Sequence, residues 1–400
     1  MRRTDAAGAD TLHGPAPRAP VHFAGAIPDN AGPAPTPPSS GSTMPTPRVG
    51  DALLCYCRAG FEPELAAELT ERAALTGFAG YARTERGSGY VEFMSDDAAQ
   101  LSRALPFPQL IFARQKLLRF ADLRGLPAHD RITPLLAALE ASGASKPFGA
   151  LQVEHPESDE TKPLAALARS FGNALRPALR KAGWLTPQDG DHRQRLHVVF
   201  LAGDRVLLAA ANPHDSSEWS SGIPRLRTHP SAPSRSALKL EEALLTLLDH
   251  DERQALVRDN MQAADLGAAP GGWTWVLMRN GMKVTSVDNG PLQQALLDSG
   301  RVDHLRADGF SWQPKRRLDW MVCDMVEQPR RVAERMATWM REEWCRYAIF
   351  NLKLPMKKRW DETRLCLELF ERQAGRPLTV RARQLYHDRE EITVLALPAD

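Results

Sequence analysis

The hydrophobic and polar positions between residues 50 and 120 follow a regular succession of periods. A short apolar run comes first, and the apolar positions after it recur every three or four residues through Leu65, Leu69 and Ala73, which is typical of a helix. A hairpin with a glycine turn, a second helix and a longer strand follow. The segments are 52–78, 80–94, 97–104 and 109–120. This order of elements predicts a ferredoxin-like domain over residues 50–120.

The pattern changes over residues 121–212, which we interpret as a small α+β module. A helix that ends in glycine and a strand are followed by an amphipathic helix with a basic end at Arg176, Arg180 and Lys181. A hairpin that turns at residues 203–204 closes the module. Residues 213–235 show no period and are interpreted as a linker.

From residue 236 onward helix and strand periods alternate, which predicts a doubly wound α/β domain over 236–400. Ser236 stands where the first helix of this domain begins, and we expect it to be the N-cap. At the other end of the chain, residues 1–49 are rich in Pro, Ala and Gly without a hydrophobic period, which predicts a disordered arm.

Composition narrows the class of protein. The 400 residues are 43% hydrophobic and 25% charged, with a net charge of +2, so a surface for nucleic acid must be a local patch. Five scattered cysteines without a CxxC pair indicate neither a disulfide framework nor a zinc site. No apolar run approaches 18 residues, and the N-terminus lacks a secretory signal. We expect a cytoplasmic protein that holds no metal.

The stretch "DLGAAPGGW", residues 265–273, links a predicted strand to a predicted helix through a glycine-rich turn. It lacks the Gly-Lys-Ser/Thr of phosphate loops and the GxGxxG of dinucleotide sites, which favours a nucleoside-like ligand such as S-adenosylmethionine. Asp288 ends the next strand and can accept from ribose hydroxyls, and Asp308 after the third strand can accept from an adenine amino group. A plain strand-to-helix corner is the alternative for the turn taken alone.

Two charged residues end neighbouring apolar strands. Asp324 follows "WMVC", and Lys353 lies inside "IFNLKLP", where Pro355 stops the strand. Ligands of doubly wound sheets bind at the carboxyl ends of strands, so both residues are expected at one edge. Taken alone, Lys353 fits a strand-end lysine whose amine reaches water, and Asp324 fits a helix N-cap.

Lys239, Asp324, Lys353 and Glu391 resemble the Lys-Asp-Lys-Glu tetrad of the Rossmann-fold RNA ribose 2′-O-methyltransferases. The closest resemblance is to the bacterial large-subunit ribosomal RNA cytidine 2′-O-methyltransferases of the M type. The resemblance covers about residues 50–400 and rests on "SRSALKLEEA", "DLGAAPGGW", "DNG", "ADGF", "CDMVEQP", "FNLKLPMKKRW" and "HDREEITV". Glu390 is adjacent to Glu391, so the fourth position is open by one residue.

The resemblance implies a mechanism and a site. Lys353 would accept the proton of the ribose hydroxyl, while the other three tetrad residues position the hydroxyl and the lysine. Burial and Lys239 favour the neutral amine that this role needs, and Asp324 opposes it. The residues implied to bind S-adenosylmethionine are Ser236, Ala269, Pro270, Gly271, Gly272, Asp288, Asp308 and Asp324.

The implied partner is large-subunit (23S) ribosomal RNA, free or as an early precursor, bound by a monomer. In this family the module at 121–212 is a THUMP RNA-binding domain. Basic runs at 357–359 and 314–317 are either solvated faces or phosphate contacts. Trp360 and Tyr386 are candidates to stack a base.

Two other functions compete with this interpretation. An RNA base C5-methyltransferase would need a nucleophilic cysteine; Cys323 is the candidate, since Cys345 is expected in a helix. A non-catalytic rRNA-binding assembly factor would be expected to have lost the tetrad.

Overall fold

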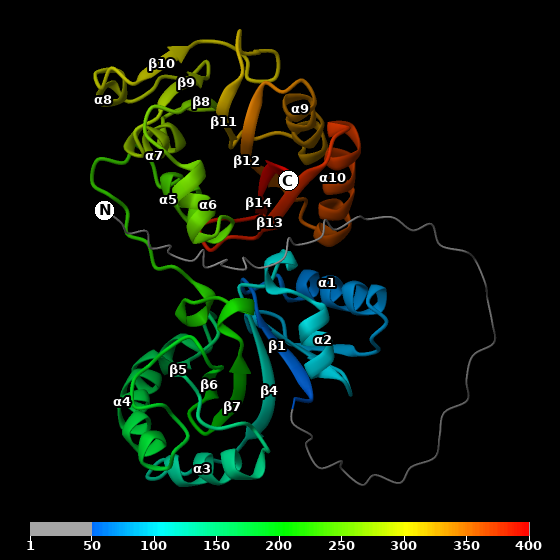
Figure 1. Cartoon of the computed structure of the whole chain (residues 1–400), viewed down its shortest axis with the longest axis vertical. Helices are drawn as coiled ribbons and strands as arrows, with labels where there is room; N and C mark the ends of the chain where they lie inside the picture. The colour runs from blue at the N-terminus through cyan, green and yellow to red at the C-terminus, as the bar shows by residue number, and fades with distance from the viewer. Residues whose placement is uncertain (1–49, 400) are drawn as a thin grey trace, which may run out of the picture.

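The computed structural model describes residues 50–399, and the arm expected at 1–49 lies outside them. Two seven-stranded sheets organise the described residues, one in each half of the chain (Figure 1). The chain passes from one half to the other through residues 212–236, where the structure has only short 3-10 turns. These turns are η3 (Pro213–Asp215) and η4 (Ser220–Gly222).

The first sheet begins with four antiparallel strands in the order β2-β3-β1-β4, and two helices connect them. This is the arrangement of a ferredoxin-like domain. The elements are β1 (Ala52–Tyr56), α1 (Glu62–Leu75), β2 (Tyr81–Thr84), β3 (Tyr90–Met94), α2 (Ala98–Ala104), η1 (Phe107–Gln109) and β4 (Gln115–Leu123).

The same sheet continues into the second module, because β4 also pairs with β7. The order from there is β7-β6-β5. The elements are α3 (Ile132–Ala141), β5 (Ala150–Glu154), η2 (Lys162–Leu164), α4 (Ala165–Lys181), β6 (Arg195–Ala202) and β7 (Arg205–Ala211). The expected boundary at residue 120 therefore falls inside β4, and one continuous sheet joins the two modules.

The second sheet has the order β10-β9-β8-β11-β12-β14-β13, and β14 alone runs in the direction opposite to the other strands. It is a doubly wound α/β sheet, as the alternating periods predict. Its elements are α5 (Ala237–Thr246), α6 (His250–Leu256), β8 (Gln262–Leu266), α7 (Gly272–Arg279), β9 (Lys283–Val287), α8 (Gln294–Leu297), β10 (Val302–Leu305), β11 (Leu318–Cys323), α9 (Pro329–Arg341), β12 (Cys345–Lys353), α10 (Arg359–Ala374), β13 (Leu378–Arg383) and β14 (Glu391–Pro398).

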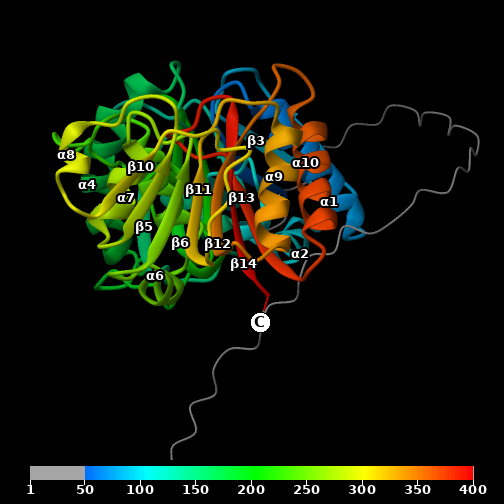
Figure 2. The ribbon, with the colours of Figure 1, turned by 90° about the horizontal axis from the view of Figure 1, so that it is seen from above.

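Helices cover both faces of this sheet, because its strands are apolar on both sides (Figure 2). In β11, Trp320 faces the core formed with α5 and α7. Met321, one residue on, faces the core formed with α9 and α10. Successive side chains of a strand point to opposite faces, so a continuous apolar run fills both cores.

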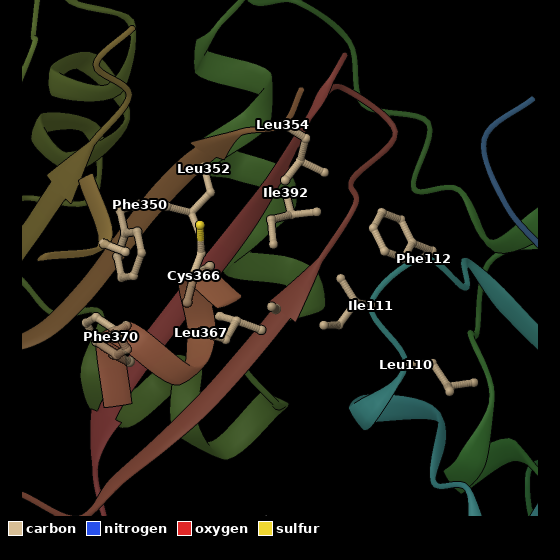
Figure 3. Close-up of a cluster of buried hydrophobic side chains, with 14 of the residues drawn as sticks. Leu110, Ile111, Phe112, Phe350, Leu352, Leu354, Cys366, Leu367, Phe370 and Ile392 are labelled. Carbon is tan, nitrogen blue, oxygen red and sulfur yellow. The ribbon is translucent and has the colours of Figure 1, made fainter. Parts of the chain in front are cut away.

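The two halves of the chain share the second of these cores. Leu110, Ile111 and Phe112, which precede β4, lie against the end of β12, β14 and α10 (Figure 3). Their partners include Leu354 and Leu367. Hydrogen bonds also cross this seam: Gln384 donates its backbone N–H to the carbonyl of Ile111 at 2.8 Å. The halves therefore form one packed body.

Candidate active site

The glycine turn after β8 requires glycine at the positions that the sequence indicates. Gly267 and Gly271 have positive φ values of 77° and 114°. A Cβ at Gly271 would lie 2.2 Å from Leu296, and one at Gly272 would lie 2.2 Å from the hydroxyl of Ser236. The turn therefore packs closely against α5 and α8, and a larger side chain at either position would force it open.

Asp288, at the end of β9, holds this turn in place. One carboxylate oxygen accepts the backbone N–H of Ala269 at 2.9 Å, and the other accepts that of Gly290 at 2.7 Å. Each oxygen has a second acceptor site. The side chain is only partly buried, so those sites are available to a ligand's hydroxyl groups.

Asp265, which precedes the turn, bonds to the helix that follows it. It is buried under α7 and accepts a hydrogen bond of 2.7 Å from the Thr274 hydroxyl, and burial raises the pKa of its carboxyl to about 7. Asp308 is exposed beyond β10, where one oxygen accepts the Phe310 N–H at 2.9 Å. The three strand ends β8, β9 and β10 thus each present the acid that the sequence places there.

Ser236 differs from its expected role. It stands at the N-cap position of α5, but its side chain makes no capping hydrogen bond, because its backbone is already helical. Its hydroxyl pairs instead with that of Ser234 at 2.6 Å, beside Gly272. The serine therefore contributes to the wall of the glycine turn rather than to the stability of α5.

The four residues of the tetrad form a closed ring. Lys353 at the end of β12 contacts Asp324 and bonds Glu391 at 2.5 Å. Lys239 on α5 bonds Asp324 at 3.3 Å and also contacts Glu391. Each lysine thus bridges both carboxylates, and the four charges alternate around the ring. Sheet register explains part of this meeting, since Lys353 pairs directly with Glu391 across β12 and β14.

The neighbouring acid Glu390 is excluded from the ring. It is exposed and bonds Arg359 at 2.5 Å. Glu391 is the first residue of β14 and pairs with Lys353, whereas Glu390 lies just before the strand and is held by Arg359. The structure places Glu391 in the ring.

The other members of the ring determine the charge state of Lys353. Burial disfavours the charge of Lys353, but Asp324 and Glu391 outweigh burial and raise the pKa of this lysine above its ordinary value. Burial alone would raise the pKa of Glu391, yet Lys353 and Lys239 lower it. The expectation that burial and Lys239 keep Lys353 neutral is therefore wrong for this arrangement: the ring holds a protonated lysine at neutral pH.

Three polar residues support Asp324, and the sequence analysis missed them. Asn351 donates its side-chain N–H to the Asp324 oxygen that also contacts Lys353, at 2.9 Å. The Asn351 oxygen accepts the Thr393 hydroxyl at 2.7 Å. Thr393 also lies 3.0 Å from Asp388. Alternation of apolar and polar residues in "IFNLK" and "EITVL" is the signal that could have found them, since Asn351 and Thr393 are fully buried.

The Thr393 hydroxyl lies within hydrogen-bond distance of two acceptors, Asn351 and Asp388, but has only one hydrogen to donate. Burial and the charge of Glu391 raise the pKa of Asp388 to about 8, so its carboxyl is mostly protonated at neutral pH. The protonated carboxyl can donate to Thr393, which leaves the hydroxyl hydrogen for Asn351. A directed chain of hydrogen bonds therefore runs from Asp388 through Thr393 and Asn351 to Asp324.

Several expected RNA contacts do not lie where the sequence analysis placed them. Trp360 is buried against Phe112 and donates to Glu71 at 2.8 Å, so it cannot stack a base. Arg359 is paired with two glutamates at the domain seam. The run 314–317 precedes β11, at the opposite edge of the sheet from Lys353.

Other basic and aromatic residues that were candidates to contact RNA already contact side chains of this chain. Arg176 and Arg180 on α4 share Asp189, at 2.6 and 3.0 Å. Arg114 covers one face of the Tyr386 ring at 5.4 Å, so at most its other face is free to stack. Lys357 and Lys358 are exposed just beyond Lys353. Of the expected basic contacts that remain exposed, this lysine pair lies nearest to Lys353 in the sequence.

The cysteines weigh against covalent attack on a base. Cys323 is fully buried, and burial raises the pKa of its thiol to about 12. Cys345 begins β12 and does not lie in a helix as expected; it is buried as well. Neither thiol is accessible or ionised at neutral pH, so neither is suited to be a nucleophile.

Sequence comparisons match the chain in three segments. Residues 51–117 match the RlmM ferredoxin-like domain, 130–212 the N-terminal domain of ribosomal RNA large subunit methyltransferase M, and 232–372 the FtsJ-like methyltransferases. Proteins named ribosomal RNA large subunit methyltransferase M in Xanthomonas oryzae pv. oryzae and Xanthomonas campestris pv. campestris are 69% identical over 345 residues. The alignment covers 86% of this chain and 99% of each relative.

This chain belongs to the ribosomal RNA large subunit methyltransferase M family. Membership confirms the predicted family, and it makes the chain an enzyme of the methyltransferase class. The predicted fold class is confirmed as well, with a ferredoxin-like domain before a Rossmann-like methyltransferase domain. The THUMP assignment of the middle module stays a prediction.

Solved structures show weaker likeness. TrmN from Thermus thermophilus aligns with 87% of this chain and 99% of its own, at 18% identity and a TM-score of 0.32. The fibrillarin pre-rRNA processing protein of Methanococcus jannaschii aligns with 53% of this chain and 85% of its own, at 14% identity and a TM-score of 0.33. Within residues 50–399, no helix is long and apolar enough to span a membrane, and no cluster of metal-ligating side chains occurs.

Proposed function

We propose that this chain transfers a methyl group from S-adenosylmethionine to the 2′-oxygen of a cytidine ribose in large-subunit ribosomal RNA, in the cytoplasm. The observation that carries the proposal is the closed ring of Lys239, Asp324, Lys353 and Glu391 at the carboxyl edge of the sheet. Family membership supports the substrate class, and the resemblance of the motifs to cytidine-specific relatives supports the nucleotide.

The residues around the glycine turn fit a nucleoside-like ligand that carries an amino acid. Asp288 has free acceptor sites for the two ribose hydroxyls, and Asp308 is exposed with one oxygen in use. The backbone of residues 269–272, Ser236 and the outer side of Asp324 would line the remainder. When bound, S-adenosylmethionine supplies a methyl group already activated on a sulfonium.

Lys353 is suited to take the hydroxyl's proton once it is neutral. A neutral amine has two N–H donors and one lone pair. Asp324 and Glu391 take up the two donors, so the lone pair is left for the hydroxyl. Lys239 also bonds both carboxylates, so the ring has a net negative charge while Lys353 is neutral and becomes electrically neutral when Lys353 takes the proton. The ring thus orients the base, although it also raises the pKa that the base must overcome.

Exposed apolar side chains flank the ring on both sides. Val326, two residues after Asp324, is 91% exposed, and Met356, three residues after Lys353, is 87% exposed. Large apolar side chains that face water at an active-site edge are typical of binding surfaces. We propose that they contact the nucleotide bases in place of Trp360, while Lys357 and Lys358 contact phosphates.

Replacing Lys353 by alanine tests the proposal. We expect Lys353→Ala to abolish methyl transfer and to leave binding of S-adenosylmethionine intact, since Lys353 does not contact the glycine turn. Calorimetry measures binding, and mass mapping of 23S rRNA from a deletion strain complemented with each variant locates the lost ribose methyl. Lys283→Ala, which removes an exposed lysine at the start of β9, the end of the strand opposite the glycine turn, is the matched control.

Wild-type turnover in Lys353→Ala would contradict the base assignment. Cys323→Ala separates the rival chemistry, because a base C5-methyltransferase would lose its activity and a ribose methyltransferase would keep it.

A further inference from the structure

A cavity of about 270 Å³ lies where the two halves of the chain meet, away from the glycine turn. Its walls come from the segment before β4, the turns η3 and η4, helix α5 and the end of β13. Two arginines, one from each half, line it: Arg114 and Arg383. They are only 5% and 8% exposed. A buried positive charge is costly unless an anion or a full set of hydrogen bonds compensates it.

Neither arginine has a full set of hydrogen-bond partners within residues 50–399. Each guanidinium has five N–H donors. Arg114 uses one nitrogen, bonded to the Gln384 side chain at 2.9 Å and the Leu385 carbonyl at 3.1 Å. Arg383 uses one nitrogen, bonded to the Phe107 carbonyl at 3.1 Å. The Nε of each is buried without an acceptor, and no carboxylate of the described residues forms an ion pair with either.

The nearby acid does not fill this role. Glu242 also lines the cavity, but its oxygens accept the backbone N–H groups of Tyr386 and His387, at 2.8 and 2.9 Å, and the His387 ring. The two other titratable groups in the wall, His214 and Glu218, are exposed at its rim. Burial lowers the pKa of both Arg114 and Arg383 to about 10, although Glu242 acts on both, and Glu68 on Arg383, in the opposite direction. Glu68 is buried and already accepts the backbone N–H groups of Ile111 and Phe112 and pairs with Arg72.

Aromatic rings fix the two guanidinium planes. Phe107 lies 4.2 Å from the Arg383 guanidinium, and Tyr386 lies 5.4 Å from that of Arg114. A ring over one face leaves the N–H edges of the guanidinium free, and such edges match the oxygens of a phosphate. We propose that this cavity binds a phosphate group between Arg114 and Arg383.

The position of the cavity points to the RNA backbone as the source of that phosphate. Glu242 and Thr246 of the cavity wall lie on α5, the helix that carries Lys239 of the ring. The loop after Arg383 continues to Glu391, the other end of the ring. The cavity is slightly smaller than the roughly 300–1,000 Å³ of sites for whole small molecules, which suits a single phosphate. The RNA source rests on the proposed function, whereas the phosphate site does not.

Thermal unfolding of the full chain tests the site without any activity measurement. In phosphate, compared with chloride at equal ionic strength, we expect the wild type to melt at a higher temperature. Arg383→Gln should bind inorganic phosphate at least tenfold more weakly by calorimetry. Thr246→Glu, which places a carboxylate in the cavity, should melt higher than the wild type in chloride and lose the response to phosphate. Thr246→Gln, of equal size without the charge, should keep that response.

Equal melting in phosphate and chloride, together with unchanged RNA affinity in Arg383→Gln, would overturn the site and leave water as its occupant. An unchanged phosphate response in Thr246→Glu would overturn it as well, and this variant decides the question if Arg383→Gln does not fold.

The source of the phosphate is tested by measuring how tightly the full chain binds a fragment of 23S rRNA. If the backbone is the source, Arg383→Gln weakens RNA binding and lowers the slope of log affinity against log salt by about 1. Phosphate binding with unchanged RNA affinity would assign the site to free phosphate and overturn the RNA source alone.

Discussion

Replacing Asp388 by asparagine should stabilise this protein while keeping its activity. Oδ2 of Asp388 accepts the Leu385 N–H at 3.0 Å, and Oδ1, which lies 3.3 Å from the Thr393 hydroxyl, is the oxygen whose proton can be donated to Thr393. An asparagine amide has the same shape, donates through its NH₂ group and accepts through its oxygen. The substitution therefore reproduces every hydrogen bond that the protonated acid makes.

The magnitude follows from the pKa of Asp388. Burial raises it to about 8 in the folded protein, whereas an unfolded aspartate has a pKa of about 3.9. Between these values the folded state holds a proton that the unfolded state releases, so the free energy of unfolding falls as pH rises. At pH 7 this costs the wild type about 4 kcal/mol, at roughly 1.4 kcal/mol per pH unit. Asparagine does not titrate, and Asp388→Asn avoids the cost.

Urea unfolding at several pH values measures the effect. The difference in free energy of unfolding between Asp388→Asn and wild type should vanish below pH 4 and grow steadily towards pH 8. Methyl transfer should persist, because Asn351 still holds Asp324. Thr393→Val is the contrasting variant: it keeps the shape, leaves two buried polar groups unpaired, and should cost about 1–3 kcal/mol of stability.

A destabilised Asp388→Asn at pH 7 would refute the reasoning, since it would show that the native carboxyl is ionised. A difference in stability that does not change with pH would do the same, because it would have no connection with a proton.

Three further predictions concern the site and the domain seam. Asp288→Ala should weaken binding of S-adenosylmethionine by about 1–3 kcal/mol in calorimetry, since two hydroxyl contacts and the clamp on the turn are lost; an unchanged dissociation constant would place the ribose elsewhere. Because the ring raises the pKa of Lys353, the single-turnover rate should rise about tenfold per pH unit from pH 7 to 9, and Glu391→Gln should shift the rise to lower pH; a flat profile would exclude proton transfer to a lysine. A fragment of residues 213–400 should unfold at lower urea than the full chain, since it exposes Leu354 and Leu367; equal midpoints would show that the halves are independent.

The domain seam also bears on how RNA binding is assigned. The sequence predicts that the N-terminal modules hold the RNA, because they carry no candidate catalytic residue. Removing them also strips the apolar cover from β12, β14 and α10 (Figure 3). A loss of activity in the 213–400 fragment therefore would not by itself identify an RNA-binding role, and single substitutions on the exposed surface are the cleaner test.

Local sequence was sufficient to determine most of the strands, the glycine turn and the charged strand ends; the start of β12 is an exception, because Cys345 was expected in a helix. Apolar periodicity reports burial directly, and a turn that needs positive φ selects glycine within a few residues. Strand ends in a doubly wound sheet meet at one edge, so Asp324 and Lys353 could be placed together from order alone. The family motifs added Lys239 and Glu391, which no local period distinguishes.

Only the tertiary structure decided what surrounds those residues. Glu391 rather than Glu390 enters the ring because the register of β14 against β12 turns one of them inward. Trp360 is buried because the other half of the chain covers it, and Lys353 is protonated because two carboxylates reach it from separate elements. Burial and pKa depend on neighbours that are distant in sequence, and no run of adjacent residues encodes them.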